Sequence, residues 1–190
     1  MNEGLKILNG QSLKQSDSLQ TDISKLLRYR IPANLDTETL STLIANASFV
    51  TYRLGDEIID LSANRSNAQS SRLEDSSTNG LYFIYQGQVR LLCHRAGQTQ
   101  PVTVQVLSEG EVFGADDYFI EQSLSYRALA ASDVQIAQIS ASSLNHLLAN
   151  CAPLKEQWAN ATHQRERLIF FRTLTPLGSL PAHRLRPWVP

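Results

Sequence analysis

The sequence predicts a mainly β domain, a double-stranded β-helix or jelly-roll barrel, with helices before and after it. Between residues 47 and 140, about eight short segments alternate apolar and polar residues, and turns that contain glycine separate them. The flanking segments instead repeat apolar residues every three or four positions, as helices do. The chain has 190 residues, of which 42% are hydrophobic, so it is long enough to bury the core of one such domain.

The N-terminal part of the chain is predicted to lie outside the β-sheet core. Residues 1–20 are polar and rich in serine and glutamine, so we expect them to be flexible. Residues 21–46 should form two helices, the first ending before Pro32 and the second capped by Asp36. These helices would pack against the strands that follow.

Seven strand segments are predicted from alternation and turn residues: 48–54, 58–59, 81–85, 88–93, 102–107 and two within 126–139. In the first of them, Phe49, Tyr52 and Leu54 should be buried anchors. Gly87 should form the turn of a hairpin between its two neighbouring strands. The alternate valines of the segment 102–107 should all face the core.

One segment interrupts this series of strands. Residues 62–79 contain only Leu73 and two alanines as apolar residues. Such a segment cannot bury enough apolar area to fold by itself. We therefore expect a mobile surface insertion.

Two helices are predicted at residues 141–174. The first spans Ser142–Asn150 and the second spans Leu154–Leu174, after Pro153. Along the longer helix, a stripe recurs at steps of three and four residues: Leu154, Trp158, Ala161, Arg165, Leu168 and Arg172.

The long helix also carries four consecutive large apolar residues, which point in four directions around it. We expect an interface formed by Trp158, Leu168, Ile169, Phe170 and Phe171. The partner would be a second copy of the chain or a following domain, and the alternative is packing of the helix onto its own strands. Three flanking arginines would form the polar rim of this interface: Arg165, Arg167 and Arg172.

The stretch Phe113–Ala130, FGADDYFIEQSLSYRALA, is the candidate ligand site, and we call it the cassette. Its layout is a turn with glycine, a short helical segment and a strand that resumes near Tyr126. Glycine lets the backbone approach a ligand closely, and the start of a helix directs free N–H groups outward, so this layout can hold a phosphate. The expected ligand-binding residues are Phe113, Gly114, Ala115, Asp116, Asp117, Leu124, Ser125 and Tyr126.

From Ile31 to Leu174 the chain resembles the cyclic nucleotide-binding domains of catabolite-activator-type regulators and of kinase regulatory subunits. The resemblance rests on Gly55-Asp56 in a turn, the strand–turn segment Tyr82–Val89, the segment Gly110–Gly114 and the cassette. It implies the jelly-roll fold and a regulatory, ligand-binding function.

The cassette departs from the family at two positions. In the family, a Glu that binds the ribose follows Phe-Gly, and an Arg nine residues later binds the cyclic phosphate. These positions fall on Ala115 and Leu124 here, and strand alternation turns Arg127 to the opposite face. Each lost charge-assisted hydrogen bond contributes roughly 1.5–3 kcal/mol. We therefore expect a degenerate cassette that does not bind cyclic AMP or cyclic GMP in the usual way, and Asp116 and Asp117 should repel an anion further.

Several function classes are disfavoured by the sequence. The four histidines show no metal-ligand spacing and no nucleophile motif is present, so we expect no catalysis, metal or cofactor: His94, His146, His163 and His183. Cys93 and Cys151 are far apart, as is usual for free thiols of a cytosolic protein. The net charge of −1 argues against nucleic-acid binding by this chain. No apolar window is long enough to span a membrane, and we expect no membrane contact by this chain.

Residues 175–190 are predicted to be a linker or the start of a following domain. Thr175–Leu185 repeats the pattern of Ile31–Leu40, with one inserted residue. The chain therefore resembles the N-terminal piece of a longer protein, and its architecture resembles that of cyanobacterial-type ABC exporters with a cysteine-peptidase domain. In that setting it would be a cytoplasmic regulatory or docking module for an unknown small-molecule ligand. The alternatives are a truncated transcriptional regulator of the Crp/Fnr type and a sensor of another nucleotide-like ligand.

Overall fold

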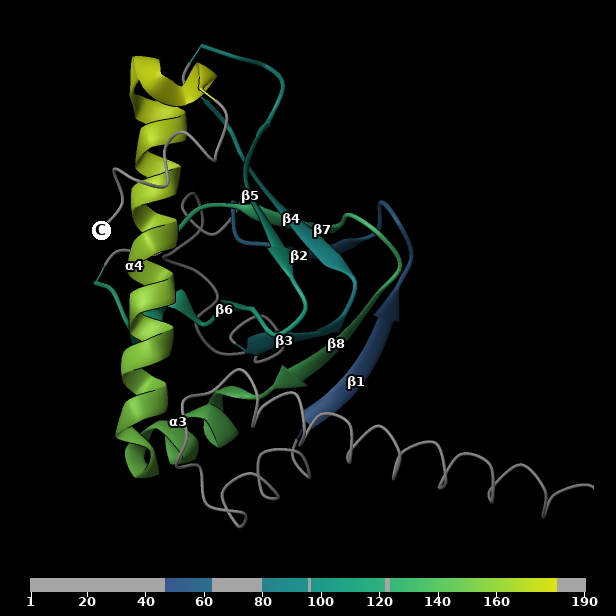
Figure 1. The fold of residues 1–190 in the computed structure, drawn as a ribbon, viewed down its shortest axis with the longest axis vertical. Helices are drawn as coiled ribbons and strands as arrows, with labels where there is room; N and C mark the ends of the chain where they lie inside the picture. The colour runs from purple at the N-terminus through teal and green to yellow at the C-terminus, as the bar shows by residue number, and fades with distance from the viewer. Residues whose placement is uncertain (1–46, 63–79, 96, 122–123, 181–190) are drawn as a thin grey trace, which may run out of the picture.

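The computed structural model of the protein describes residues 47–62, 80–95, 97–121 and 124–180 (Figure 1). The predictions for residues 1–46, for the insertion at 63–79 and for the last ten residues lie outside the described residues.

Among the described residues, eight strands form two antiparallel sheets of four strands each. In order, the first sheet contains β1 (Ala47–Tyr52), β8 (Val134–Ile139), β3 (Leu81–Gln86) and β6 (Val112–Gly114). The second contains β2 (Glu57–Asp60), β7 (Arg127–Ala130), β4 (Gln88–Cys93) and β5 (Val102–Ser108). This strand order confirms the predicted jelly roll. Within the described ranges no strand pairing joins the two sheets, so the predicted barrel is not closed.

The predicted hairpin around Gly87 is wrong. Strand β3 pairs with β6 and β8, whereas β4 pairs with β5 and β7 in the other sheet. Gly87 has a φ of 91°, and a Cβ atom at this position would lie 2.3 Å from the carbonyl oxygen of Asp133. Gly87 therefore forms a tight corner at which the chain passes from one sheet to the other.

The predicted burial of the first strand is also wrong in part. Tyr52 is half-buried, but Phe49 is exposed, and Leu54 is 69% exposed in the turn that follows the strand. Strand β1 is the edge strand of its sheet, and only its two end residues, Ala47 and Tyr52, pack against the core clusters.

A bulge in β5 explains the burial along this strand. Val104 is buried as predicted, but Val106 is exposed and Leu107 is buried instead. The pairing of β4 with β5 shifts between Leu91 and Leu92, which leaves Val104 without a direct partner on β4. Such a bulge changes the phase of the alternation.

The buried apolar residues form two clusters, and the helices cover one of them. One cluster lies between the two sheets and contains residues such as Ile84, Leu91 and Ile136. The other lies under α3 (Ala141–Asn150) and α4 (Ala152–Leu174), where Leu144 and Trp158 pack with strand residues. Both helices confirm the prediction, and α4 runs along one side of the sheets (Figure 1). None of the described helices is long and apolar enough to span a membrane.

Candidate functional site: the cassette and its link to the long helix

The cassette begins with a tight turn between β6 and a short 3-10 helix, η2 (Asp116–Tyr118). Gly114 has a φ of 77°, and a Cβ atom there would lie 2.6 Å from the carbonyl oxygen of Gly80 and 2.7 Å from Cδ2 of Tyr82. Ala115 also has a positive φ, of 51°, which is uncommon for a residue with a Cβ atom. Since this conformation costs free energy, the surrounding contacts must hold the turn in place.

A buried ion pair connects the cassette to α4. Asp116 is 3% exposed and Arg165, in the middle of α4, is 2% exposed. The Nη1 atom of Arg165 donates to Oδ1 of Asp116, and the hydroxyl of Thr162 donates to the same oxygen at 3.3 Å. Two residues of α4 therefore hold the first residue of η2.

Tyr126 hydrogen-bonds to the other carboxylate oxygen of Asp116. Its hydroxyl donates to Oδ2 of Asp116 at 2.6 Å and accepts from the backbone N–H of Gly114 at 2.9 Å. Burial, and then the charge of Asp116, raise the pKa of Tyr126 well above its ordinary value. The hydroxyl therefore stays protonated and continues to donate to the carboxylate.

The second terminal nitrogen of Arg165 reaches β6. Nη2 donates to the carbonyl oxygen of Val112 at 2.5 Å, and the guanidinium carbon lies 5.9 Å from the centroid of the Tyr126 ring. Burial acts to lower the pKa of Arg165, but the charge of Asp116 and its other partners outweigh burial, so the pKa is raised. The arginine is therefore charged. We call the six connected residues the cassette network: Val112, Gly114, Asp116, Tyr126, Thr162 and Arg165.

The structure corrects the predicted charge of the site. Asp116 was expected to repel an anion, but Arg165 compensates its charge. Asp117, the other predicted carboxylate, is exposed to solvent. The charge of Asp116 is therefore offset within the domain, and both of its carboxylate oxygens already accept hydrogen bonds.

The two positions that depart from the family pattern are filled by apolar side chains. Ala115 and Leu124 are both buried, each in one of the two core clusters. Arg127 points away from them, as strand alternation predicts, and pairs with Glu57 and Asp60 of β2. Arg127 therefore does not bring its positive charge to the position of Leu124.

The remaining predicted site residues serve the packing of the cassette. Phe113 is fully buried and stacks on Tyr82, with ring centroids 5.0 Å apart. The carbonyl oxygen of Ser125 accepts a hydrogen bond from Cys93 Sγ at 3.2 Å. Burial raises the pKa of the Cys93 thiol to about 12, so this cysteine remains a thiol at neutral pH.

Arg165 and Thr162 are the site residues that the sequence prediction missed. Arg165 was assigned to the rim of an interface, yet it is buried in the domain. A signal was present, because Arg165 lies on the same stripe as Trp158 and Leu168. A charged residue on a buried helix face needs a partner of opposite charge.

Fewer of the predicted interface residues of α4 are exposed in the structure than the sequence predicted. Trp158, 4% exposed, and Leu168 are buried in the domain's own core and are not available to a partner. Ile169 is half-buried against the cluster between the sheets. Phe170 is 52% exposed and contacts the half-buried Phe171 edge to face, with ring centroids 5.8 Å apart. Contact with a second copy or a following domain stays a prediction for these two residues.

The residues available for catalysis or metal binding are dispersed. Across the described ranges, no group of three or more His, Cys, Asp or Glu residues is arranged to hold a metal ion. Cys93 and Cys151 are both buried and free.

Comparisons with known proteins agree with this fold. Residues 73–151 match the family model described as the cyclic nucleotide-binding domain. A sequence search of curated proteins finds no match.

Solved structures of the same fold include three of particular use. The catabolite activator protein of Thermus thermophilus is 21% identical, with a TM-score of 0.53 over 71% of this chain and 57% of that one. The regulatory subunit of a cAMP-independent protein kinase A from Trypanosoma cruzi, bound to guanosine, is 15% identical, with a TM-score of 0.59 over 82% and 51%. The sensor domain of the transcriptional regulator DNR from Pseudomonas aeruginosa is 18% identical, with a TM-score of 0.52 over 80% and 99%. This chain therefore spans little more than half the length of the first two proteins.

The fold and the family model agree: residues 73–151 match the cyclic nucleotide-binding domain, and the chain shares the fold of the solved structures above. Its cassette lacks the two polar side chains expected at positions 115 and 124, and a buried ion pair ties it to α4.

Proposed function

We propose that this domain is a non-catalytic regulatory module whose cassette is coupled to α4 and does not bind cyclic AMP or cyclic GMP in the usual way. The observation that carries the proposal is the buried pair of Asp116 and Arg165, which joins the candidate ligand site to the helix that leaves the sheets. The C-terminal part of α4, with Phe170 and Phe171, would pass the signal to a partner or a following domain.

The physical basis of the coupling is the cost of separating buried charges. Moving the cassette away from α4 would leave Arg165 or Asp116 buried without its partner, which costs several kcal/mol. The two elements therefore move together or not at all. A ligand that binds one arrangement better than the other shifts the population of both elements, and this is the requirement for regulation.

Cyclic nucleotides are excluded in this proposal because the polar groups of the cassette already form hydrogen bonds with one another. The N–H of Gly114 donates to Tyr126, and the two nitrogens of Arg165 that reach the cassette are paired with Asp116 and Val112. A cyclic phosphate would have to displace these partners, and Leu124 offers it no charge in return.

The larger protein in which the module works stays a prediction. A transcriptional regulator is favoured by the match to almost the whole DNR sensor domain. The exporter setting rests only on a likeness of architecture, and the comparisons reported above do not support it. The full-length coding sequence distinguishes the two, since a helix-turn-helix domain and a peptidase domain differ in sequence.

The ligand that shifts the cassette is proposed to be uncharged. The kinase regulatory subunit from Trypanosoma cruzi shares this fold, is described as cAMP-independent and was solved with guanosine, a nucleoside without phosphate. This supports a nucleoside-like ligand as the alternative to an anionic one for the present chain.

Replacing Asp116 by asparagine tests the coupling. The side chain keeps its size but loses its charge, so Arg165 stays buried without a counter-ion. We expect faster amide hydrogen exchange both in residues 113–121 and in the part of α4 around Thr162. The matched control is Asp117→Asn, because Asp117 is the exposed neighbour. Faster exchange in the cassette with an unchanged α4 would contradict the coupling.

A further inference from the structure

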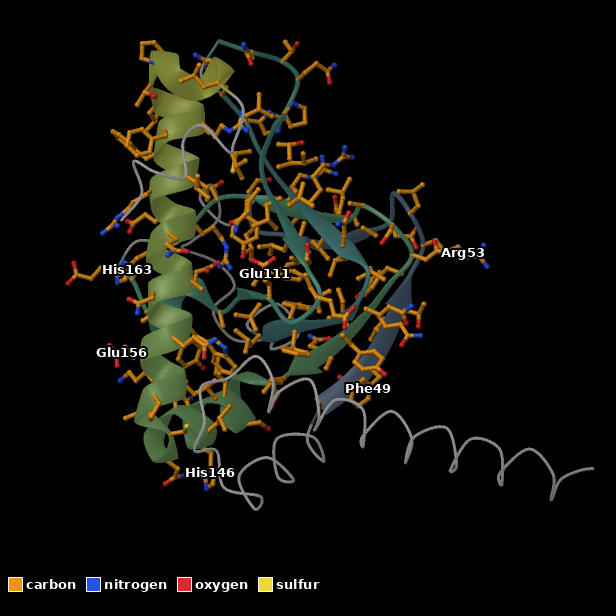
Figure 2. All side chains as sticks on the ribbon, viewed as in Figure 1. Phe49, Arg53, Glu111, His146, Glu156 and His163 are labelled. Atoms are coloured by element: carbon orange, nitrogen blue, oxygen red, sulfur yellow. The ribbon has the colours of Figure 1, made fainter. Side chains whose placement is uncertain are left out.

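Strand β1 forms one edge of the first sheet, and its outer side is unpaired among the described residues. It pairs with β8 on one side, and no described strand lies on the other side. Every second residue of an antiparallel strand directs its N–H and C=O groups to such an open side, where a further strand can pair with them. In Figure 1, β1 lies on the side of the domain away from α4, and Figure 2 shows Phe49 on that side.

The other three edge strands have features that hinder pairing with a further strand. Strand β2 has only four residues, with Glu57 and Asp60 at its ends and an irregular register with β7. Strand β5 contains a bulge and packs against α4. Strand β6 has three residues, and the carbonyl oxygen of Val112 accepts from Arg165 of α4. Short length, charge, irregularity and cover by a helix are the usual protections of a sheet edge.

Within the described part of the structure, β1 has none of these protections. Its sequence, ASFVTY, contains no charged residue, proline or glycine, and all six residues pair with β8 without a register shift. Phe49 and Val50 are 37% and 36% exposed, whereas the end residues Ala47 and Tyr52 pack against the core clusters. The strand is therefore anchored at both ends and regular between them, which suits it to pairing with another strand.

The side chains of β1 favour a second copy of the same strand as the partner. A two-fold axis perpendicular to the sheet makes the paired strands antiparallel and keeps each face of the sheet on the same side. With the axis at Phe49, this exposed residue lies opposite its own copy. The flanking pairs are then Ala47 with Thr51 and Ser48 with Val50. An aromatic pair directly across two strands is stabilising, and no like charges meet in this register.

We propose that two copies of the chain associate by pairing their β1 strands around a two-fold axis at Phe49. The four described strands of the first sheet in each copy then continue into one antiparallel sheet. The same edge is used in both copies, so the assembly closes at two chains. This contact is separate from the cassette network and from Phe170 and Phe171, so it does not rest on the proposed function.

Charge substitutions at Phe49 test the pairing. The full chain carries Phe170→Ser and Phe171→Ser throughout, so that the end of α4 does not contribute to association. In sedimentation equilibrium, we expect this chain to form dimers with a Kd below ~1 mM. Phe49→Lys and Phe49→Glu each place like charges opposite one another, and each should weaken the dimer at least about tenfold. An equal mixture of the two variants should restore dimers, because opposite charges then face each other across the axis.

Two further comparisons assign the contact and its register. Val106→Lys is the matched control at a 42% exposed position of the other sheet, and it should leave the Kd unchanged. Phe49→Cys should form a disulfide-linked dimer under mild oxidation, because paired Cα atoms lie about 4.5–5.5 Å apart. Val50→Cys is equally exposed but lies diagonally across from its own copy, too far for a disulfide. Cys93 and Cys151 are buried and should not react.

Several results would overturn the proposal. One is a chain that stays monomeric up to about 1 mM, since another segment or protein would then be the partner of the edge. Others are dimers that the charge variants leave unchanged, or a mixture of the charge variants that stays monomeric. Cross-linking through Val50→Cys in place of Phe49→Cys would contradict the axis. The cysteine variants decide the outcome if a charge variant does not fold.

Discussion

Replacing Arg165 by methionine is expected to lower the free energy of unfolding by about 3–5 kcal/mol, because Asp116 then stays buried without a counter-ion. Methionine preserves much of the volume of the arginine stem, so lost packing contributes little. The carbonyl of Val112 loses its donor as well. Urea unfolding, followed by tryptophan fluorescence, measures the change.

Two further variants separate the ion pair from other effects. In the double variant Asp116→Asn with Arg165→Met, no buried charge remains, and most of the lost stability should return. Arg167→Met makes the same replacement at an exposed position of α4, so its effect should stay within about 0.5 kcal/mol. A loss of less than about 1 kcal/mol for Arg165→Met would mean that the pair behaves like an exposed one.

Gly114→Ala is expected to destabilise the domain by about 2–4 kcal/mol through two separate costs. The first is the backbone strain of a φ of 77° in a residue with a Cβ atom. The second is crowding, because the new Cβ atom would lie 2.6 Å from the carbonyl oxygen of Gly80 and 2.7 Å from the ring of Tyr82. Neither neighbour can move freely, since Gly80 O is backbone and Tyr82 is stacked on Phe113.

Gly97 provides the matched control for the crowding cost. Its φ is 76°, almost the same as that of Gly114, but a Cβ atom there would meet nothing within 4 Å. Gly97→Ala should therefore show the backbone cost alone, about 1 kcal/mol. The difference between the two variants measures how tightly the cassette turn packs against β3. Equal losses for both variants would mean that the turn relaxes to accept a side chain.

Much of the fold could be predicted from the sequence, because local patterns determine its elements. Alternation by two, turns with glycine and the periodicity of the last helices place α3, α4 and every strand except β6, which has only three residues. The sheet to which a strand belongs is not a local property. The turn at Gly87 looks like a hairpin turn in sequence, and only the close approach of Asp133 shows that it is a corner between the sheets. The exposure of Val106 depends on a bulge, which also has no local signal.

The candidate site could be predicted only in part, for the same physical reason. The cassette itself is continuous in sequence, so its turn, its short helix and its departures at Ala115 and Leu124 were predictable. The partner of Asp116 is 49 residues away on α4, and no local pattern connects the two. Asp116 was therefore expected to be a free charge, whereas it is one half of a buried pair.

Calorimetric titration of the full chain with cyclic AMP and with cyclic GMP tests the central claim most directly. The cassette network already uses the groups that a cyclic phosphate would need, so we expect no saturable binding below ~1 mM, equivalent to less than about 4 kcal/mol of binding free energy. A saturable isotherm with a Kd in the micromolar range for either nucleotide would contradict the account.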